Sequence, residues 1–119
     1  MHELSIATAV VESADAAARR HGAASVDSVC LRVGELAGVV PDALRFSFDL
    51  AAAGTALEGA RLEIEDVPAR ARCATCPGDF AVGSPPSLVC PRCAGAAVEL
   101  VSGRELELAA VRLPLGATP

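Results

Sequence analysis

Four of the five cysteines stand in two tight pairs, Cys73-Ala-Thr-Cys76 and Cys90-Pro-Arg-Cys93, with thirteen residues between the pairs. Two residues between cysteines allow both sulfurs of a turn to converge on one ion, and two such knuckles supply the four thiolates of a tetrahedral zinc site. A shell of four cysteines leaves no coordination position open, so the predicted zinc is structural. Its binding free energy is expected to be largely the folding free energy of this segment.

A redox dithiol and a nucleic-acid-binding ribbon are the alternatives for this segment. Neither pair opens a helix after a strand, as thioredoxin-like dithiols do. Arg70, Arg72 and Arg92 make the segment locally basic, but the whole chain has a net charge of −5 and a pI near 4.9. This balance disfavours broad binding of nucleic acid or of anionic membranes.

The other position that could bind a metal is His2, one residue from the amino terminus. There an imidazole nitrogen, the intervening amide nitrogen and the amine of Met1 can close small chelate rings on one ion. Three nitrogens held nearly in a plane suit Ni(II) or Cu(II) better than tetrahedral zinc. A fourth ligand could be the Glu3 backbone or carboxylate, water, or a group from a partner. On spacing alone, a histidine without a metal role remains the alternative.

Two helices and a small sheet are expected to position these residues. Apolar side chains at helical spacing predict a helix from His2 to about Arg20, ended by Gly22, and a second helix from Pro41 to near Gly54. Alternating apolar and polar residues predict strands, and these lie at Val26–Leu36, Arg61–Val67 and Arg104–Leu113. Cys30 is predicted to be a buried strand residue, and His21 a cation near a helix end.

The stretch from about Arg70 to Val101 differs in composition from the rest of the chain. It contains all four paired cysteines and four of the eight prolines, and it shows little periodicity. It cannot bury enough apolar surface to order itself, which favours a metal-stapled insertion. The predicted fold class is α+β, with two helices packed on a small mixed β-sheet and an inserted zinc-ribbon module. The predicted domains are residues 1–69 plus 102–119, and residues 70–101.

Several classes of function are disfavoured. All ten basic residues are arginine, so the chain has neither a phosphate-binding loop with its lysine nor a lysine Schiff base. No apolar run is long enough for a membrane span, and the charged Glu3, Glu12 and Asp15 argue against a signal segment. We therefore expect a cytoplasmic protein without membrane insertion. Outside the predicted metal sites there is no pocket-forming set of His, Cys and carboxylates, so an enzyme is not expected.

Taken together, these features resemble the HypA/HybF family of nickel-insertion proteins, which mature nickel-iron hydrogenases. The resemblance covers essentially the whole chain. It rests on the following stretches: Met1-His2-Glu3-Leu4-Ser5, Val33-Gly34-Glu35-Leu36, Leu44-Arg45-Phe46-Ser47-Phe48, Gly54-Thr55, Glu58-Gly59-Ala60, the two cysteine pairs and Gly103-Arg104-Glu105-Leu106.

The resemblance implies a metallochaperone that binds Ni(II) at Met1, His2 and Glu3 and delivers it to the large-subunit precursor of a nickel-iron hydrogenase. It implies structural zinc, held by Cys73, Cys76, Cys90 and Cys93. It also implies a HypB-type GTPase partner, which fits the missing lysine; service to urease maturation proteins and a homodimer stay open. One departure is that Pro77-Gly78 follows Cys76, where the family often has glycine directly after the cysteine. The alternative function is a zinc-ribbon adaptor for protein or nucleic acid, with no nickel role.

Overall fold

The computed structural model describes residues 2–83 and 85–115. The contacts divide the chain into two compact units. Unit 1 contains residues 1–32, 39–65 and 107–119, and unit 2 contains residues 33–38 and 66–106. Compactness does not show that a unit folds by itself, so the predicted domain boundaries at 69/70 and 101/102 stay a prediction.

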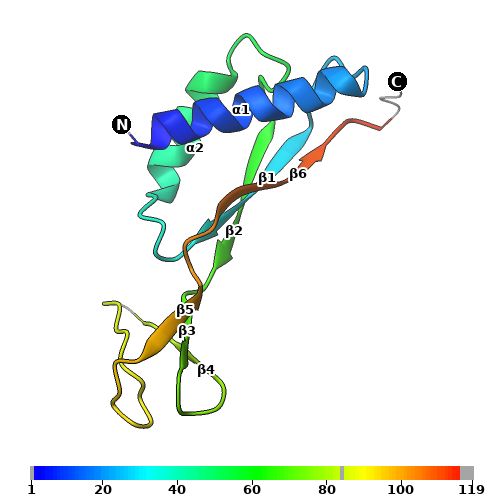
Figure 1. Ribbon diagram of the computed structural model, residues 1–119. Coiled ribbons are helices and arrows are strands. Elements are labelled where there is room, and N and C mark those ends of the chain that lie inside the picture. Colours follow the sequence, from blue (N-terminus) through cyan, green and yellow to red (C-terminus); the bar gives the residue numbers. More distant parts are fainter. Residues whose placement is uncertain (1, 84, 116–119) are drawn as a thin grey trace. The chain divides into compact units, whose positions relative to one another are not determined.

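Unit 1 has two helices on one side of its strands, α1 (His2–Arg20) and α2 (Pro41–Ala52) (Figure 1). Gly22 takes the left-handed conformation that ends α1, with φ of 69°. Pro41 lies in the first turn of α2, where its missing N–H has no intrahelical partner to lose. Both predicted helices are therefore confirmed. Within the described ranges, no helix combines the length and apolar character needed to cross a membrane.

A mixed sheet has the strand order β2-β1-β6 and consists of β1 (Ser28–Gly34), β2 (Arg61–Val67) and β6 (Leu106–Arg112). Backbone hydrogen bonds at both ends of β1 set the directions: Arg61 to Asp27 and Glu35 to Val67 make β2 parallel to β1, and Asp27 to Arg112 and Gly34 to Glu105 make β6 antiparallel. The predicted small mixed sheet is thus confirmed.

The core of unit 1 lies between the helices and β1. Val29 and Leu31 of β1 are buried with Leu44 and Phe48 of α2, as alternation and helical spacing predicted. The alternate residues of β1 point to the other side of the sheet, where Arg32 makes ion pairs with one carboxylate on each neighbouring strand. Cys30 shares that side and is only half-buried, so the prediction of a buried strand residue is wrong. In the part of the chain that the structure describes, no helix covers this other side of the sheet (Figure 1).

Unit 2 contains a second sheet that periodicity did not predict. Its strands are β3 (Arg70–Cys73), β4 (Asp79–Ala81) and β5 (Val98–Ser102), in the order β4-β3-β5. Both pairings are antiparallel, and the register shifts between Arg70 and Ala71 opposite β5. Strands this short show too few alternations to stand out in a sequence rich in proline and glycine.

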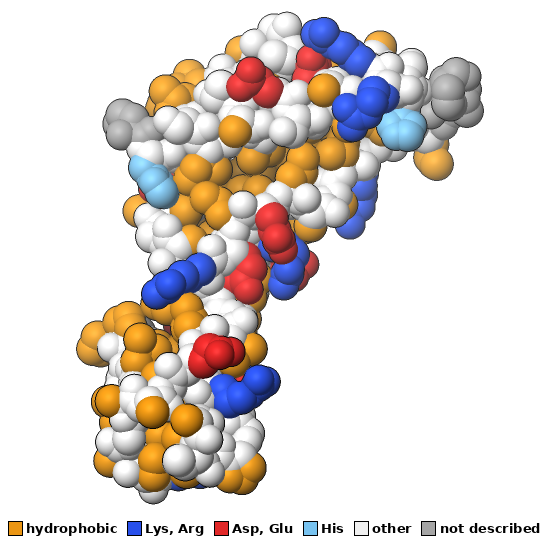
Figure 2. Space-filling model, viewed as in Figure 1, with side chains coloured by type: hydrophobic (Ala, Val, Ile, Leu, Met, Phe, Trp, Pro, Cys, Tyr) orange, Lys and Arg blue, Asp and Glu red, His pale blue; other side chains and the backbone are white. Residues whose placement is uncertain are grey.

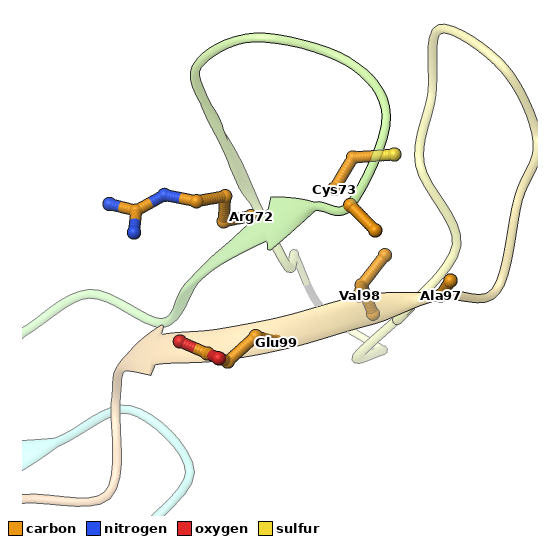
Figure 3. Close-up of a pocket in the computed structure, with 6 residues that line it drawn as sticks. Arg72, Cys73, Ala97, Val98 and Glu99 are labelled. Carbon is orange, nitrogen blue, oxygen red and sulfur yellow. The ribbon is translucent and has the colours of Figure 1, made fainter.

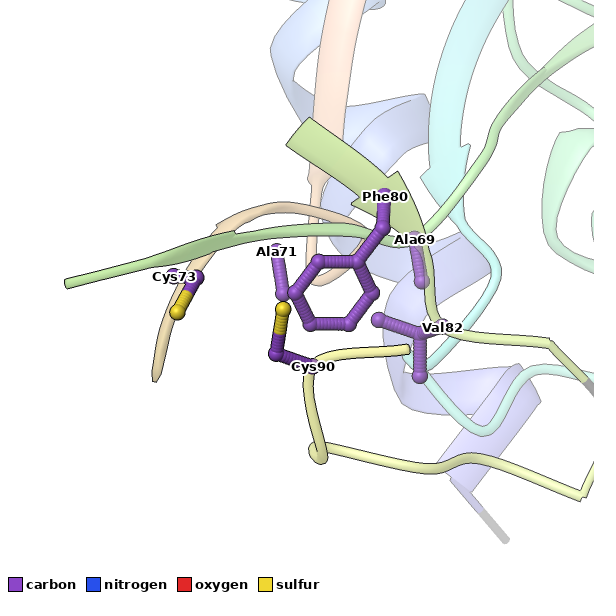
Figure 4. Close-up of a cluster of buried hydrophobic side chains, with 6 residues drawn as sticks. All are labelled: Ala69, Ala71, Cys73, Phe80, Val82 and Cys90. Atoms are coloured by element: carbon purple, nitrogen blue, oxygen red, sulfur yellow. The ribbon is translucent and has the colours of Figure 1, made fainter. Parts of the chain in front are cut away.

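A cluster of six buried side chains forms the core of unit 2. The Phe80 ring lies at its centre and faces Ala71, Val82 and Cys90 (Figure 4); Ala69 and Cys73 complete it. Two of these six residues belong to the cysteine quartet. Because the cluster contains one large side chain, its apolar surface is small, and a stapling device is needed for stability.

The segment 33–38 is tied into unit 2 by the closest backbone approach that a glycine makes in the described ranges. A Cβ on Gly34 would lie 2.2 Å from the carbonyl carbon of Gly103. The next residues add hydrogen bonds: Leu36 N donates to Gly103 O at 2.7 Å, and Ala69 N donates to the Glu35 carboxylate at 2.7 Å. Leu36 also packs against the six-residue cluster. The stretch Val33-Gly34-Glu35-Leu36 therefore has a structural role at each of its last three positions.

Gly34→Ala is expected to destabilise the protein strongly, because the added methyl group meets backbone atoms that cannot rotate away. Overpacking typically costs about 1–3 kcal/mol of unfolding free energy. Because the contact here is with backbone atoms, we expect the upper end, about 3 kcal/mol, which corresponds to a melting temperature lower by roughly 10 °C. Urea unfolding followed by circular dichroism measures this, since the chain has no Trp or Tyr.

Gly38→Ala is the matched control in the same segment. Gly38 has φ of 74° and open space where a Cβ would lie, so only the left-handed backbone is penalised, by about 1 kcal/mol. Equal losses for the two variants would contradict the close-approach explanation for Gly34.

Candidate metal sites

The four paired cysteines come together in unit 2. Their Sγ atoms all lie within 4.8 Å of one another, and the Sγ atoms of Cys73 and Cys93 are 3.6 Å apart. A disulfide requires about 2.05 Å, whereas a tetrahedron with Zn–S bonds of about 2.3 Å has sulfur–sulfur edges of about 3.8 Å. The residues present therefore fit a zinc ion, and zinc held there is structural because four thiolates fill its shell.

Two tight turns hold these sulfurs. In the second knuckle, Ala94 N donates to Cys90 O at 2.8 Å, and Ala94 itself has φ of 59°. In the first knuckle, Pro77 follows the cysteine directly, and proline cannot adopt positive φ. The left-handed position falls instead on Gly78, with φ of 83°. The departure at Pro77-Gly78 thus shifts the turn by one residue, and Cys76 still joins the cluster.

Hydrogen bonding prepares some of these thiols to lose their protons. The Thr75 hydroxyl is the main cause that lowers the pKa of Cys73 to about 6, and the backbone N–H groups of Thr75 and Cys76 add to it. The backbone N–H of Cys93 is the main cause of a lowered pKa for Cys90. Hydrogen bonding with Cys93 is the main cause of a raised pKa for Cys76. A metal ligand must be a thiolate, so metal binding is expected to release the protons that these thiols still carry.

A shallow pocket of about 400 Å³ adjoins the cluster, lined by β3, β5 and the residues next to them (Figure 3). Arg72 and Cys73 point to opposite sides of β3, so the sulfur is directed away from the guanidinium. Arg72 donates to the Asp79 carboxylate at 3.2 Å. The charged lining is therefore partly engaged in an ion pair.

The predicted residues at the chain start are only partly described. Met1 lies outside the described residues. His2 is the first residue of α1 and is exposed, and Figure 2 shows histidine side chains at the molecular surface. Glu3 is half-buried, and its Oε2 accepts a hydrogen bond from Val40 N at 3.2 Å. That bond is the main cause that lowers the pKa of the Glu3 carboxyl.

Among the described residues, the cysteine quartet is the one group of His, Cys, Asp and Glu side chains that converges as metal ligands do. His2 and Glu3 are not part of any such group. The first N–H groups of a helix have no intrahelical acceptor, and α1 begins at His2.

Sequence reasoning missed two residues that the structure places at these sites. Thr75 lies between the sulfurs of Cys73 and Cys93, and Val40 binds the Glu3 carboxylate through its backbone. The hydroxyl within the first Cys-x-x-Cys pair was a visible signal for Thr75. No sequence signal pointed to Val40, because a backbone donor has no residue signature.

A family model described as "Hydrogenase/urease nickel incorporation, metallochaperone, hypA" matches residues 1–113. The hydrogenase maturation factor HypA of Streptomyces avermitilis is 56% identical over 119 residues, covering 99% of this chain and 91% of the relative. The HypA of a Roseiflexus species is 53% identical over 111 residues, covering 93% of this chain and 90% of the relative. These matches extend over both compact units.

Two solution structures share the fold. One, described as HypA protein, has a TM-score of 0.72 and covers 96% of this chain and 97% of its own. The other, described as the nickel metallochaperone HypA of Helicobacter pylori, has a TM-score of 0.64 and covers 93% and 96%. Both are 21% identical to this chain, so this likeness concerns the fold.

Proposed function

Because this chain belongs to the HypA family of hydrogenase and urease nickel-incorporation metallochaperones, we propose that it binds Ni(II) at its amino terminus and delivers the ion to a nickel-iron hydrogenase large-subunit precursor. The family consists of metallochaperones rather than enzymes. Membership also favours this function over a zinc-ribbon adaptor without a nickel role.

The observation that supports the amino-terminal site is the position of His2. Its side chain is exposed at the first residue of α1, so it can reach an ion without unfolding the helix. The amide N–H groups of this first turn have no hydrogen-bond acceptor within the helix. With the free amine of Met1, they offer the planar nitrogen set that Ni(II) favours. An exposed site of this kind suits transfer of the ion to another protein.

We propose that Glu3 contributes its backbone nitrogen as a nickel ligand. Its carboxylate lies nearby and supplies a compensating negative charge. The carboxylate already accepts the hydrogen bond from Val40 N. The donor, Val40, is the N-cap residue of α2, so this bond connects the start of α1 to the start of α2. A bound cation at a helix start meets the positive end of the helix dipole, and an ionised Glu3 offsets this.

The zinc of this protein is structural, and we propose Cys73, Cys76, Cys90 and Cys93 as its ligands. Their four sulfurs fit the size of a zinc–thiolate tetrahedron. Zinc supplies charge and cross-linking here, and it leaves no position for a reacting group. Nickel, by contrast, is cargo and belongs to the other end of the chain.

We propose a HypB-type GTPase as the partner that binds the nucleotide. The chain has no lysine, so it cannot build the phosphate-binding loop of a nucleotide-driven protein by itself. We place the protein in the cytoplasm, where reducing conditions keep zinc-binding thiols from pairing as disulfides.

A transfer experiment tests delivery. Nickel-loaded protein is mixed with a nickel-free hydrogenase large-subunit precursor and an excess of chelator, the two proteins are separated, and nickel in the precursor is measured. We expect nickel to reach the precursor despite the chelator, and free Ni(II) at the same concentration to be captured by the chelator instead. Equal amounts of nickel in the precursor from both sources would contradict delivery.

A further inference from the structure

One side chain lies between the two cysteine knuckles without being a ligand. The Oγ1 atom of Thr75 is 3.4 Å from the Sγ of Cys73, in its own knuckle, and 3.8 Å from the Sγ of Cys93, in the other. These two sulfurs are themselves 3.6 Å apart. The hydroxyl therefore lies over one edge of the sulfur tetrahedron and can donate to either sulfur.

The donor direction follows from the charge of a loaded site. Zinc with four thiolates has a net charge of about −2, and a thiolate accepts hydrogen bonds but cannot donate them. Thr75 must then donate its hydroxyl proton. Backbone donors reach the same two sulfurs, since Thr75 N lies 3.5 Å from Cys73 Sγ and Gly95 N lies 3.4 Å from Cys93 Sγ. The Thr75 hydroxyl lies within hydrogen-bond distance of one sulfur in each knuckle.

The four cysteine residues differ in their exposure to solvent. Cys73 and Cys90 are buried, Cys76 is half-buried, and Cys93 is exposed. A chelator or an electrophile therefore reaches Cys93 most readily. Thr75 is itself exposed, and its hydroxyl lies 3.8 Å from this sulfur, so it is placed to hold the most exposed of the four ligands.

We propose that Thr75 is a positioning residue of the zinc site, whose hydroxyl joins Cys73 to Cys93 and slows the loss of zinc through the exposed Cys93. It acts through the two sulfurs and does not bind the metal. The proposal concerns zinc retention, so it does not depend on nickel binding at the amino terminus.

The test measures zinc release from the full-length, zinc-loaded protein to an excess of a chromogenic chelator. Thr75→Val keeps the shape of the exposed side chain and removes the donor. Mutation of a residue that hydrogen-bonds to a metal ligand typically weakens metal affinity about 10–100-fold. We therefore expect zinc release from Thr75→Val to be at least about tenfold faster than from the parent. Thr75→Ser restores a hydroxyl and should release zinc at nearly the rate of the parent.

Ser102→Ala is the matched control. It also removes one hydroxyl from unit 2, but this hydroxyl donates to Pro68 O at 2.8 Å, away from the cysteines. Its zinc release should equal that of the parent. Cobalt-substituted protein gives a second readout, since the sulfur-to-cobalt absorption should shift in Thr75→Val and return in Thr75→Ser, which a purely structural role for Thr75 does not predict.

Alkylation with iodoacetamide identifies the sulfur through which zinc is lost. The thiolate attacks the methylene carbon, a carbon–sulfur bond forms, iodide leaves with the electron pair of the broken bond, and zinc loses that ligand. Among the four quartet cysteines, mass spectrometry should find Cys93 modified first, and faster in Thr75→Val. Unchanged zinc release in Thr75→Val, or first modification at another of these four cysteines, would overturn the proposal.

Discussion

His2→Ala is expected to lose Ni(II) binding at the amino terminus while keeping one zinc per chain. Mutation of a residue that only hydrogen-bonds to a metal ligand already weakens metal affinity about 10–100-fold. Removal of a ligand itself should therefore weaken nickel binding at least about 100-fold. The His2 side chain is exposed at the first residue of α1, so the helical circular dichroism should not change. Titration with Ni(II), with zinc counted separately, measures the effect.

His21→Ala is the matched control for this variant. His21 is also exposed and lies just after the other end of α1, so it changes the histidine content by the same amount. It should bind nickel like the parent. A second variant with a short extension before Met1 keeps His2 but removes the free amine from its place, and it should lose nickel as His2→Ala does.

The amino-terminal site is wrong if both His2→Ala and the extended protein bind nickel like the parent. A loss in His2→Ala alone would show that the imidazole is a ligand and the amine is not. The parent protein must carry a free Met1 amine, confirmed by mass spectrometry, because an expression tag at this end blocks the site being measured.

Cys73→Ser is expected to lose the structural zinc and to unfold the sheet of β3, β4 and β5. Cys73 belongs both to the sulfur cluster and to the six-residue core of unit 2. That core is too small to hold the segment once the ion is gone, because structural zinc supplies folding free energy directly. The helices of unit 1 should remain, since their core of Leu31, Leu44 and Phe48 contains none of the four cysteines.

Two measurements check this second prediction. Metal analysis should find less than one zinc per chain, and hydrogen exchange should lose protection in residues 70–73 and 98–102 while protection in α1 persists. Cys30→Ser is the control, because Cys30 lies on β1 outside the quartet and its variant should keep one zinc. Zinc bound by Cys73→Ser as tightly as by the parent would rule out the four-thiolate site.

The cysteine quartet and the two helices could be predicted because their signals are local. Two residues between cysteines define a knuckle whatever the rest of the chain does. Residues Ala7, Val11 and Ala14 recur at helical spacing, and all three are buried in α1. Periodicity also predicted the central strand, with Val29, Leu31 and Val33 buried. It could not predict how far Cys30 would be buried, because that depends on whether anything covers the far face of the sheet.

The sequence by itself thus determined the helices, the strands of the first sheet, the zinc-binding spacing and the candidate at His2, each of which depends on neighbours along the chain. Only the tertiary structure placed Gly34 against Gly103 and connected Glu35 to Ala69. Only it placed the Thr75 hydroxyl between sulfurs of two knuckles. Such contacts join residues far apart in the chain, and no periodic pattern records a contact whose two partners meet only after the intervening chain has folded.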